Sequence, residues 1–152
     1  MKVLHLVGGS DFSGVYKGVY ILHKALIDQN IQSKILNDCS YKENLKKNDN
    51  VFCINENFFQ RLLNKFNIIV EKILKSLFLK SPRSSFTIGL LGSDITKSKH
   101  YKDADIIHIH WLNQGFIKLR SISNVKKPII WTLRDMWPFT GGAHYQMDFQ
   151  KY

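Results

Sequence analysis

The stretch KVLHLVGGSDFSGVYKGVYILHKALIDQNIQSKIL, from Lys2 to Leu36, indicates the fold class of this chain. Its opening run, KVLHLV, is rich in β-favouring residues and predicts a strand. The loop GGSDFSG follows, and apolar residues then recur at helical spacing as far as Asn30. IQSKIL predicts a second strand. Strand, helix and strand in this order form a βαβ unit, which implies a parallel sheet covered by helices. The helix positions expected to face the sheet are Val15, Val19, Leu22, Leu26 and Ile27.

The last third of the chain repeats this alternation. DADIIHIHW (103–111) and KKPIIWTL (126–133) predict strands, and GFIKLRSIS between them predicts a helix. A short helical patch is expected over 96–101, and VFCI (51–54) is either a short strand or a buried turn. The pattern predicts a Rossmann-like, doubly wound α/β fold with a mainly parallel sheet. A chain of 152 residues is expected to form a single domain, residues 1–152.

A long amphipathic segment, residues 56–79, lies between these two regions. Its apolar residues recur at steps of three and four with basic residues between them, which predicts one long helix. Two interpretations are open: the helix covers the core and its basic residues face water, or it binds an anionic membrane surface. The apolar positions are Phe59, Leu62, Leu63, Phe66, Ile69, Val70, Ile73, Leu74 and Leu77, and the basic ones are Arg61, Lys65, Lys72 and Lys75.

The charge and composition of the chain limit the classes of partner that it is expected to bind. A net charge of +10 favours an anionic partner such as a membrane surface, a phosphorylated ligand or nucleic acid. No nucleic-acid-binding signature supports the last of these, so no nucleic-acid partner is expected. No apolar run is long enough to span a bilayer, and the residues after Met1 do not resemble a signal peptide, so none is expected. The two cysteines have no metal-ligand spacing and are expected to be reduced. These features predict a cytoplasmic protein, with peripheral contact to the inner face of the membrane left open.

The loop Gly8–Gly14 follows the first strand and opens the first helix. α/β folds bind phosphate or sugar at this place, because a ligand can approach glycine backbone and the positive end of the helix. The spacing matches neither the dinucleotide-binding nor the Walker pattern. Gly8, Gly9 and Gly14 are therefore candidate binding residues, or the glycines of a plain turn.

His108, Ile109, His110 and Trp111 end the third predicted strand. Both histidines lie on one face, because side chains alternate along a strand. A metal site would need further ligands, and the neighbouring sequence offers no cysteine or carboxylate cluster, so no metal is expected. The carboxyl end of a parallel strand favours a ligand contact by His110 and Trp111. A histidine satisfied within the core is the alternative.

The segment RDMWPFTGGAHY, residues 134–145, follows the last predicted strand. Its Arg-Asp pair is either a structural ion pair or part of a polar pocket. The aromatic residues and glycines around the pair suit a pocket that stacks on a sugar ring. The candidate ligand-contacting residues here are Arg134, Asp135, Trp137, Gly141, Gly142 and His144.

Together, KVLHLV with its glycine-bearing loop, LHKAL, DIIHIHW followed by GF, KKPIIWTL and RDMWPFTGGAHY resemble the amino-terminal domain of GT-B glycosyltransferases of the retaining group-1 (family four) type. That family includes bacterial enzymes that build capsule, lipopolysaccharide and exopolysaccharide. The resemblance implies the amino-terminal half of a GT-B architecture, which binds mainly the acceptor, a saccharide or lipid-linked molecule. It implies a nucleotide sugar as donor substrate, and no metal or other cofactor.

The resemblance also implies roles. The glycines of the first loop would approach the donor phosphates and the acceptor, and His110 would line the sugar site. Arg134 and Asp135 would lie on the cleft wall. His110 and Asp135 are therefore the candidate catalytic residues.

The family's carboxyl-terminal domain, which binds the nucleotide and the leaving phosphate, is not among these 152 residues. Sugar transfer needs positive charge or hydrogen-bond donors on the leaving diphosphate. We therefore expect a fragment or one half of a split enzyme, nearly inactive without its partner domain. The alternative is a non-catalytic module that binds an acceptor or a membrane surface.

Overall fold

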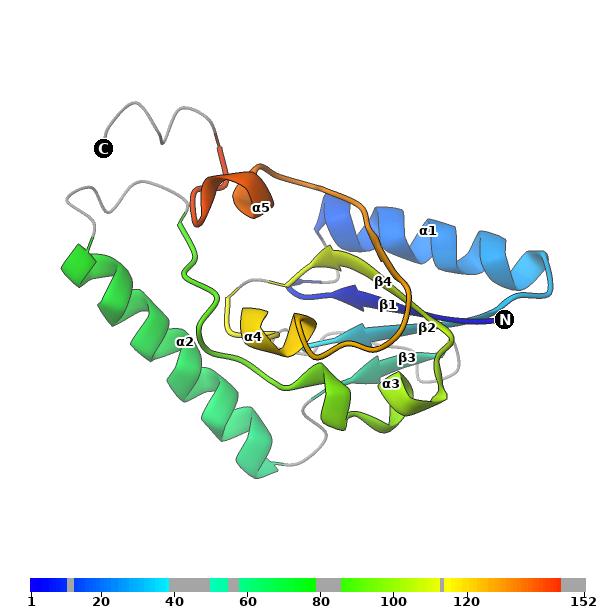
Figure 1. The fold of residues 1–152 in the computed structure, drawn as a ribbon, viewed down its shortest axis with the longest axis horizontal. Helices are drawn as coiled ribbons and strands as arrows, with labels where there is room; N and C mark the ends of the chain where they lie inside the picture. Colours follow the sequence, from blue (N-terminus) through cyan, green and yellow to red (C-terminus); the bar gives the residue numbers. More distant parts are fainter. Residues whose placement is uncertain (11–12, 39–49, 55–57, 79–85, 113, 146–152) are drawn as a thin grey trace.

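The computed structural model describes residues 1–10, 13–38, 50–54, 58–78, 86–112 and 114–145. A five-stranded, all-parallel sheet with helices on both faces forms its centre (Figure 1). The strand order is β3-β2-β1-β4-β5, so the fold is the α/β, Rossmann-like, doubly wound type that the alternation predicts. The strands are β1 (Lys2–Val7), β2 (Gln32–Asn37), β3 (Val51–Cys53), β4 (Ile106–Trp111) and β5 (Ile129–Trp131). The helices are α1 (Gly14–Asp28), α2 (Phe58–Phe78), α3 (Lys99–Asp103), α4 (Leu119–Ile122) and α5 (Trp137–Thr140), with a 3-10 turn, η2 (Ile95–Lys97).

The strand β1 lies at the centre of the sheet and is buried on both faces. Leu4 and Leu6 pack with Ile107 and Ile109 of β4 on the face that η2 and α3 cover. His5 and Val7 point to the opposite face, which α1 covers, as alternation along a strand requires. Two apolar clusters, one on each face, therefore hold the helices to the sheet.

The helix α1 begins at a cap that the sequence loop supplies. The Ser13 side chain accepts a hydrogen bond from the Tyr16 backbone N–H at 3.1 Å, which satisfies one of the free donors of the first turn. Tyr16, Val19 and His23 are the buried residues of α1. The predicted face is rotated in consequence: of its members Val19 is buried, and the other four are half-buried.

The predicted helix in GFIKLRSIS is much shorter than expected, because the residues before α4 have other hydrogen-bond partners. Ser93 forms a bridge with Ile117, and the Lys118 backbone N–H donates to the Ser93 carbonyl at 3.2 Å. Phe116 and Ile117 are buried in the core as parts of a loop. Only Leu119–Ile122 remain helical.

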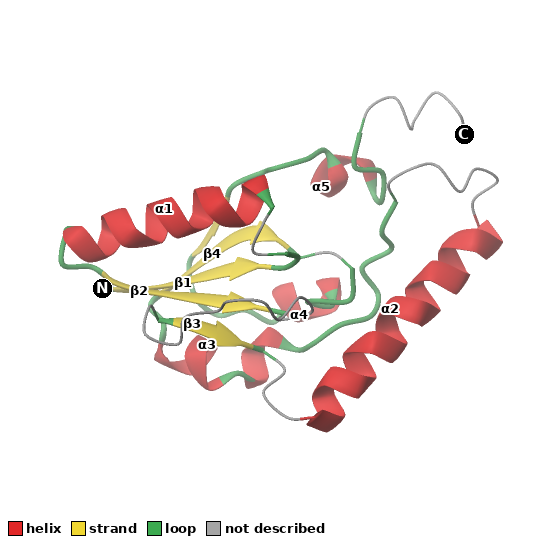
Figure 2. Ribbon diagram, turned by 180° about the vertical axis from the view of Figure 1, so that it is seen from behind, coloured by secondary structure: helices red, strands yellow, loops and turns green. Residues whose placement is uncertain are grey.

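The long predicted helix is present as α2, and it stands away from the sheet (Figures 1 and 2). The interpretation that its apolar side covers the core is wrong. Leu62, Phe66, Ile69, Ile73 and Leu77 are all more than half exposed, at 53–73%. The apolar side of α2 therefore faces solvent.

Two further observations concern the cysteines and the lengths of the helices. Cys53, at the end of β3, is disulfide-bonded, so the expectation of reduced thiols is wrong for this residue. Cys39 lies outside the described residues. Within the described ranges, no helix combines the length and the apolarity that a bilayer crossing requires.

We predict that Gly92→Ala destabilises the fold by about 3 kcal/mol. The backbone at this position has φ of +141°, which residues with a side chain rarely adopt, and a Cβ would clash with the backbone of Ile117 and Lys118. A Cβ on Gly92 would lie 2.7 Å from the Ile117 carbonyl carbon. Gly14→Ala is the matched control, since no atom lies within 4 Å of its Cβ position. Urea unfolding followed by circular dichroism measures both variants. Equal unfolding midpoints for Gly92→Ala and Gly14→Ala would contradict the prediction.

Candidate substrate cleft

A cleft of about 400 Å³ opens at the carboxyl ends of β1 and β4. The order of the strands reverses here, because β2 and β4 pair with opposite edges of β1. Open α/β sheets bind ligands at such a switch point. The cleft is lined by Gly8, Gly9, Ser10, Ser13, Val15, Trp111, Gln114, Arg134, Asp135, His144 and Tyr145.

The glycine loop forms one wall and lies directly against Trp111. The Gly8 backbone N–H donates to the Trp111 carbonyl at 2.9 Å. Gly9 has φ of +87°, and a Cβ there would lie 3.3 Å from Cζ3 of Trp111. Two residues at the end of β2 hold the loop from the other side: Asn37 Nδ2 donates to the Val7 carbonyl at 2.7 Å, and Asp38 Oδ2 accepts from the Gly9 N–H at 3.4 Å. The backbone at Gly8 and Gly9 is therefore held in place by hydrogen bonds to the end of β2 and to β4.

The opposite wall contains a fixed carboxylate–imidazole pair. Nδ1 of His144 and Oδ2 of Asp135 are 2.6 Å apart, and both side chains are largely buried. Nε2 of His144 lies 2.9 Å from Oγ1 of the buried Thr87. The second oxygen of Asp135 accepts from the Trp137 backbone N–H at 3.1 Å. Since the imidazole is held on both sides, the position of the Asp135 carboxylate at the cleft is fixed.

The residues around Thr87 anchor this wall to the body of the protein. The Trp137 indole N–H donates to the Thr87 carbonyl at 2.8 Å, and the Thr87 N–H donates to the Gly142 carbonyl at 3.0 Å. Gly142, at φ of +157°, is so close to Phe86 that a Cβ would lie 2.2 Å from the ring. Trp137 and Gly142 thus do not line the cleft, but they fix the backbone of Thr87, whose side chain contacts His144.

Arg134 supplies the positive charge of the cleft. Its exposed guanidinium lies beside α1, where a Cβ on Gly18 would be 3.6 Å from Nη1. Among the described residues no carboxylate forms an ion pair with Arg134, and the neighbouring Asp135 carboxylate is bound to His144 instead. Arg134 and Asp135 therefore do not form the structural ion pair that the sequence left open.

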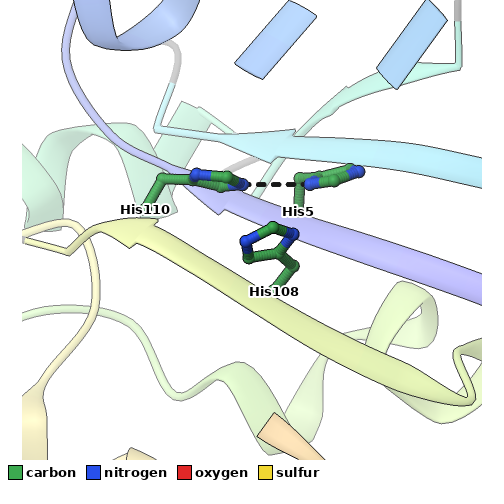
Figure 3. A group of neighbouring side chains, drawn as sticks. All are labelled: His5, His108 and His110. Atoms are coloured by element: carbon green, nitrogen blue, oxygen red, sulfur yellow. Dashed lines mark hydrogen bonds between the residues drawn. The ribbon is translucent and has the colours of Figure 1, made fainter. Parts of the chain in front are cut away.

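Three buried histidines lie beside one another on the α1 face of the sheet (Figure 3). His5 of β1 is in register with His108 of β4, and Nδ1 of His5 lies 3.0 Å from Nε2 of His110. Nε2 of His108 lies 2.8 Å from Oγ1 of Thr132. The remaining ring nitrogens of His5 and His110 have no hydrogen-bond partner in the described part of the chain, and they point away from each other (Figure 3). The hydrogen-bonding capacity of the three imidazoles is therefore only partly used by the described residues.

Burial keeps these imidazoles neutral. Burial, together with His108 and His23, lowers the pKa of His5 to about 3. Burial, together with His108, His5 and Arg134, lowers the pKa of His110 to about 2. The pKa of His108 is also lowered, by burial and by Arg134. Neutral imidazoles are ligands for transition metals, and one nitrogen from each histidine lies within 4.8 Å of the others. The group supplies three ligands, whereas a structural zinc site takes four protein ligands and a catalytic one takes three with water or substrate in the fourth position.

The structure brings six of the sequence-predicted residues to the cleft and places five elsewhere. Gly8, Gly9, Trp111, Arg134, Asp135 and His144 line it. His110 is buried in the histidine cluster, Gly14 is exposed on the first turn of α1, Gly141 ends α5, and Trp137 and Gly142 lie behind the wall.

Sequence reasoning missed several residues of the site. Ser10 and Ser13 lie inside the predicted loop, Tyr145 is the last residue of the predicted segment 134–145, and Gln114 lies between two predicted segments. Their places next to the predicted glycine, tryptophan and histidine residues were the only signal for them. Thr87 gave no signal at all, because nothing in its local sequence shows that it meets His144.

Comparison of the chain with protein-family models, with curated proteins and with solved structures finds no significant match.

We predict that acidification weakens the fold through the histidine cluster. The unfolded chain protonates His5 and His110 near their ordinary pKa of 6.5, whereas the folded chain does so only far below it. The contribution of the neutral, buried His5 and His110 to the free energy of unfolding is present above pH 6.5 and is lost as the pH falls toward 3. At pH 5 the free energy of unfolding should be lower by roughly 1 to 2 kcal/mol per histidine than at pH 7.5.

Urea unfolding at pH 7.5 and pH 5 measures this difference. His5→Gln removes one of the titrating groups, so its pH dependence should be shallower than that of the unsubstituted chain. The same dependence in both proteins would show that the cluster does not cause it.

Proposed function

We propose that this chain forms the acceptor-side wall of a glycosyltransferase active site, which binds a saccharide beside the diphosphate of a nucleotide-sugar donor. One observation carries the proposal: six candidate residues from three separate segments line a single cleft at the strand-order switch. The resemblance to GT-B enzymes of cell-surface polysaccharide synthesis supports the same assignment, and it would place the reaction on the cytoplasmic side of the membrane.

The cleft has the chemistry that a saccharide needs. Trp111 offers an aromatic ring next to the glycine loop, and Tyr145, which is 63% exposed, offers another at the rim. Rings of this kind stack on the apolar face of a sugar while polar groups bind its hydroxyls. Ser10, Ser13 and Gln114 line the same space and can supply hydrogen bonds.

Asp135 is the group of this wall that can accept a proton from a sugar hydroxyl. His144 is held between Asp135 and Thr87, so both of its nitrogens are engaged. The carboxylate faces the cleft and keeps further acceptor sites on its two oxygens. Its fixed position suits a hydrogen-bonded acceptor hydroxyl, as general base catalysis requires.

Arg134 and the first turn of α1 favour an anionic group at the same place. The guanidinium has no carboxylate partner in the described part of the chain. Ser13, the cap of α1, lines the cleft, so the positive end of a 15-residue helix adjoins it. Developing charge on a leaving diphosphate would be stabilised here.

Saccharide binding tests the first part of the proposal. A panel of common hexoses, N-acetylhexosamines and their disaccharides is screened against the chain by saturation-transfer difference NMR. Binding, rather than turnover, is measured, because the proposed architecture needs a second domain for the nucleotide. We expect at least one saccharide to bind, and Trp111→Ala to weaken it at least about tenfold through loss of stacking.

Asp135→Asn should weaken binding of the same saccharide, since one carboxylate oxygen, which accepts hydrogen bonds, is replaced by an amide nitrogen, which donates them. Ile21→Ser, on the exposed side of α1, is the control and should bind as the unsubstituted chain does. Binding that none of the cleft variants alters would refute the proposed site.

Anion binding tests the second part. Inorganic pyrophosphate is titrated into the chain, and backbone amide shifts are followed by NMR. Arg134→Ala should weaken binding by about ten- to a hundredfold, because a hydrogen bond to a charged group contributes roughly 1.5 to 3 kcal/mol. Arg120→Ala, at an exposed position on α4, is the control. An equal effect of the two substitutions would contradict a specific role of Arg134.

A further inference from the structure

The helix α2 is held to the protein by its polar side. Glu71 is buried, and its Oε1 accepts a hydrogen bond from the Gly89 backbone N–H at 2.8 Å. Asn64 is also buried, and a Cβ on Gly115 would lie 3.5 Å from its Oδ1. Asn64 and Glu71 therefore lie on the side of α2 that faces the protein, together with Ile68, whose Cγ1 would be 3.3 Å from a Cβ on Gly115.

The opposite side of α2 forms a continuous apolar stripe. Its members recur at steps of four, three, four and four residues, so they lie on one side of the helix. Such a stripe is larger than the single exposed apolar side chains found on any surface. The stripe consists of Leu62 (54% exposed), Phe66 (61%), Ile69 (55%), Ile73 (53%) and Leu77 (73%).

Positive charge borders the stripe on one side. Lys65 and Lys72 are exposed and lie seven residues apart, so they share a side of the helix next to the apolar one. Glu71 is the only acidic residue of α2, and its carboxylate is bound to Gly89. The described solvent-facing side chains of α2 therefore carry no negative charge.

The other side of the stripe adjoins a basic pocket. A cavity of about 560 Å³ lies between α2 and the segments around η2 and α4, and Leu63, next to the stripe, lines it. Lys97, Lys99 and Lys118 line the same cavity. Asp94 pairs with Lys118 at 3.1 Å and offsets one of these charges. Lysines thus flank the apolar stripe on both sides.

We propose that this side of α2 docks on an anionic phospholipid surface. An apolar stripe bordered by lysines is the arrangement by which interfacial helices bind such membranes: the apolar side chains enter the acyl boundary and the lysines meet the headgroups. A second copy of the chain fits less well, because pairing two α2 helices would bring lysine beside lysine, whereas paired helices carry complementary charges at these positions. The proposal does not depend on what occupies the cleft.

Vesicle co-sedimentation of the purified chain tests the proposal. Phosphatidylcholine vesicles are compared with vesicles that also contain phosphatidylglycerol, at low and high salt. The chain should bind the anionic vesicles, and binding should fall as salt rises, because screening weakens the attraction. Lys65→Glu with Lys72→Glu should reduce binding at least about tenfold, and Ile69→Ser with Ile73→Ser should reduce it similarly.

Matched controls come from α1. Lys17→Glu with Lys24→Glu makes the same change of charge at exposed positions, and Ile21→Ser removes an apolar side chain that is 69% exposed. All the substituted side chains are exposed, so circular dichroism should show the same fold in every variant. Loss of binding in the α2 variants, with binding kept in the α1 variants, supports the proposal.

Three results would overturn it: no binding to anionic vesicles, equal effects of the α1 and α2 variants, or a dimer in light scattering that Ile69→Ser with Ile73→Ser dissociates while vesicles are not bound. The last result would identify a second copy of the chain as the occupant.

Discussion

The parallel pairing of β1 with β4 is the constraint on which the rest of the structure depends. These strands are far apart in the sequence, yet they form the centre of the sheet, with Leu4 opposite Ile107 and Leu6 opposite Ile109. Because side chains alternate, a shift of one residue would turn these apolar residues to the wrong face. After Leu6 the register shifts, so that Val7 pairs with Trp111 and the Gly8 backbone N–H donates to the Trp111 carbonyl. The cleft therefore depends on the same strand pairing as the core.

This register also places imidazoles in the interior next to the cleft. His5, His108 and His110 share one face, and two of their ring nitrogens have no partner among the described residues. Burial of partly satisfied polar groups costs stability, so a core built only for stability would use apolar residues here. The charge of Arg134 lowers the pKa of His108 and of His110, in addition to the larger effect of burial. The stability of the fold and the electrostatics of the cleft are therefore linked.

The cleft and the apolar stripe of α2 are separate surfaces with compatible roles. The cleft offers aromatic rings, hydrogen-bonding groups and the guanidinium of Arg134, which suit the proposed saccharide next to a diphosphate. The stripe offers apolar side chains between lysines, as an anionic lipid surface would require. A protein that carries both could take a lipid-linked acceptor from the membrane to which it is bound. Thr87 and Gly89, in one short segment, serve both surfaces, since Thr87 holds His144 and Gly89 holds Glu71.

The parts of the fold that depend on local periodicity can be predicted from the amino-acid sequence. The strands β1, β2 and β4, the helix α1 and the parallel α/β class follow from patterns within a few residues, and strand ends with glycine or tryptophan indicated much of the cleft. Only the tertiary structure decided that Asp135 binds His144 instead of Arg134, that His110 is buried, and that α2 turns its apolar side to solvent. The reason is physical: each outcome rests on contacts between residues distant in the chain, such as Thr87 with His144 and Glu71 with Gly89, and periodicity carries no information about them.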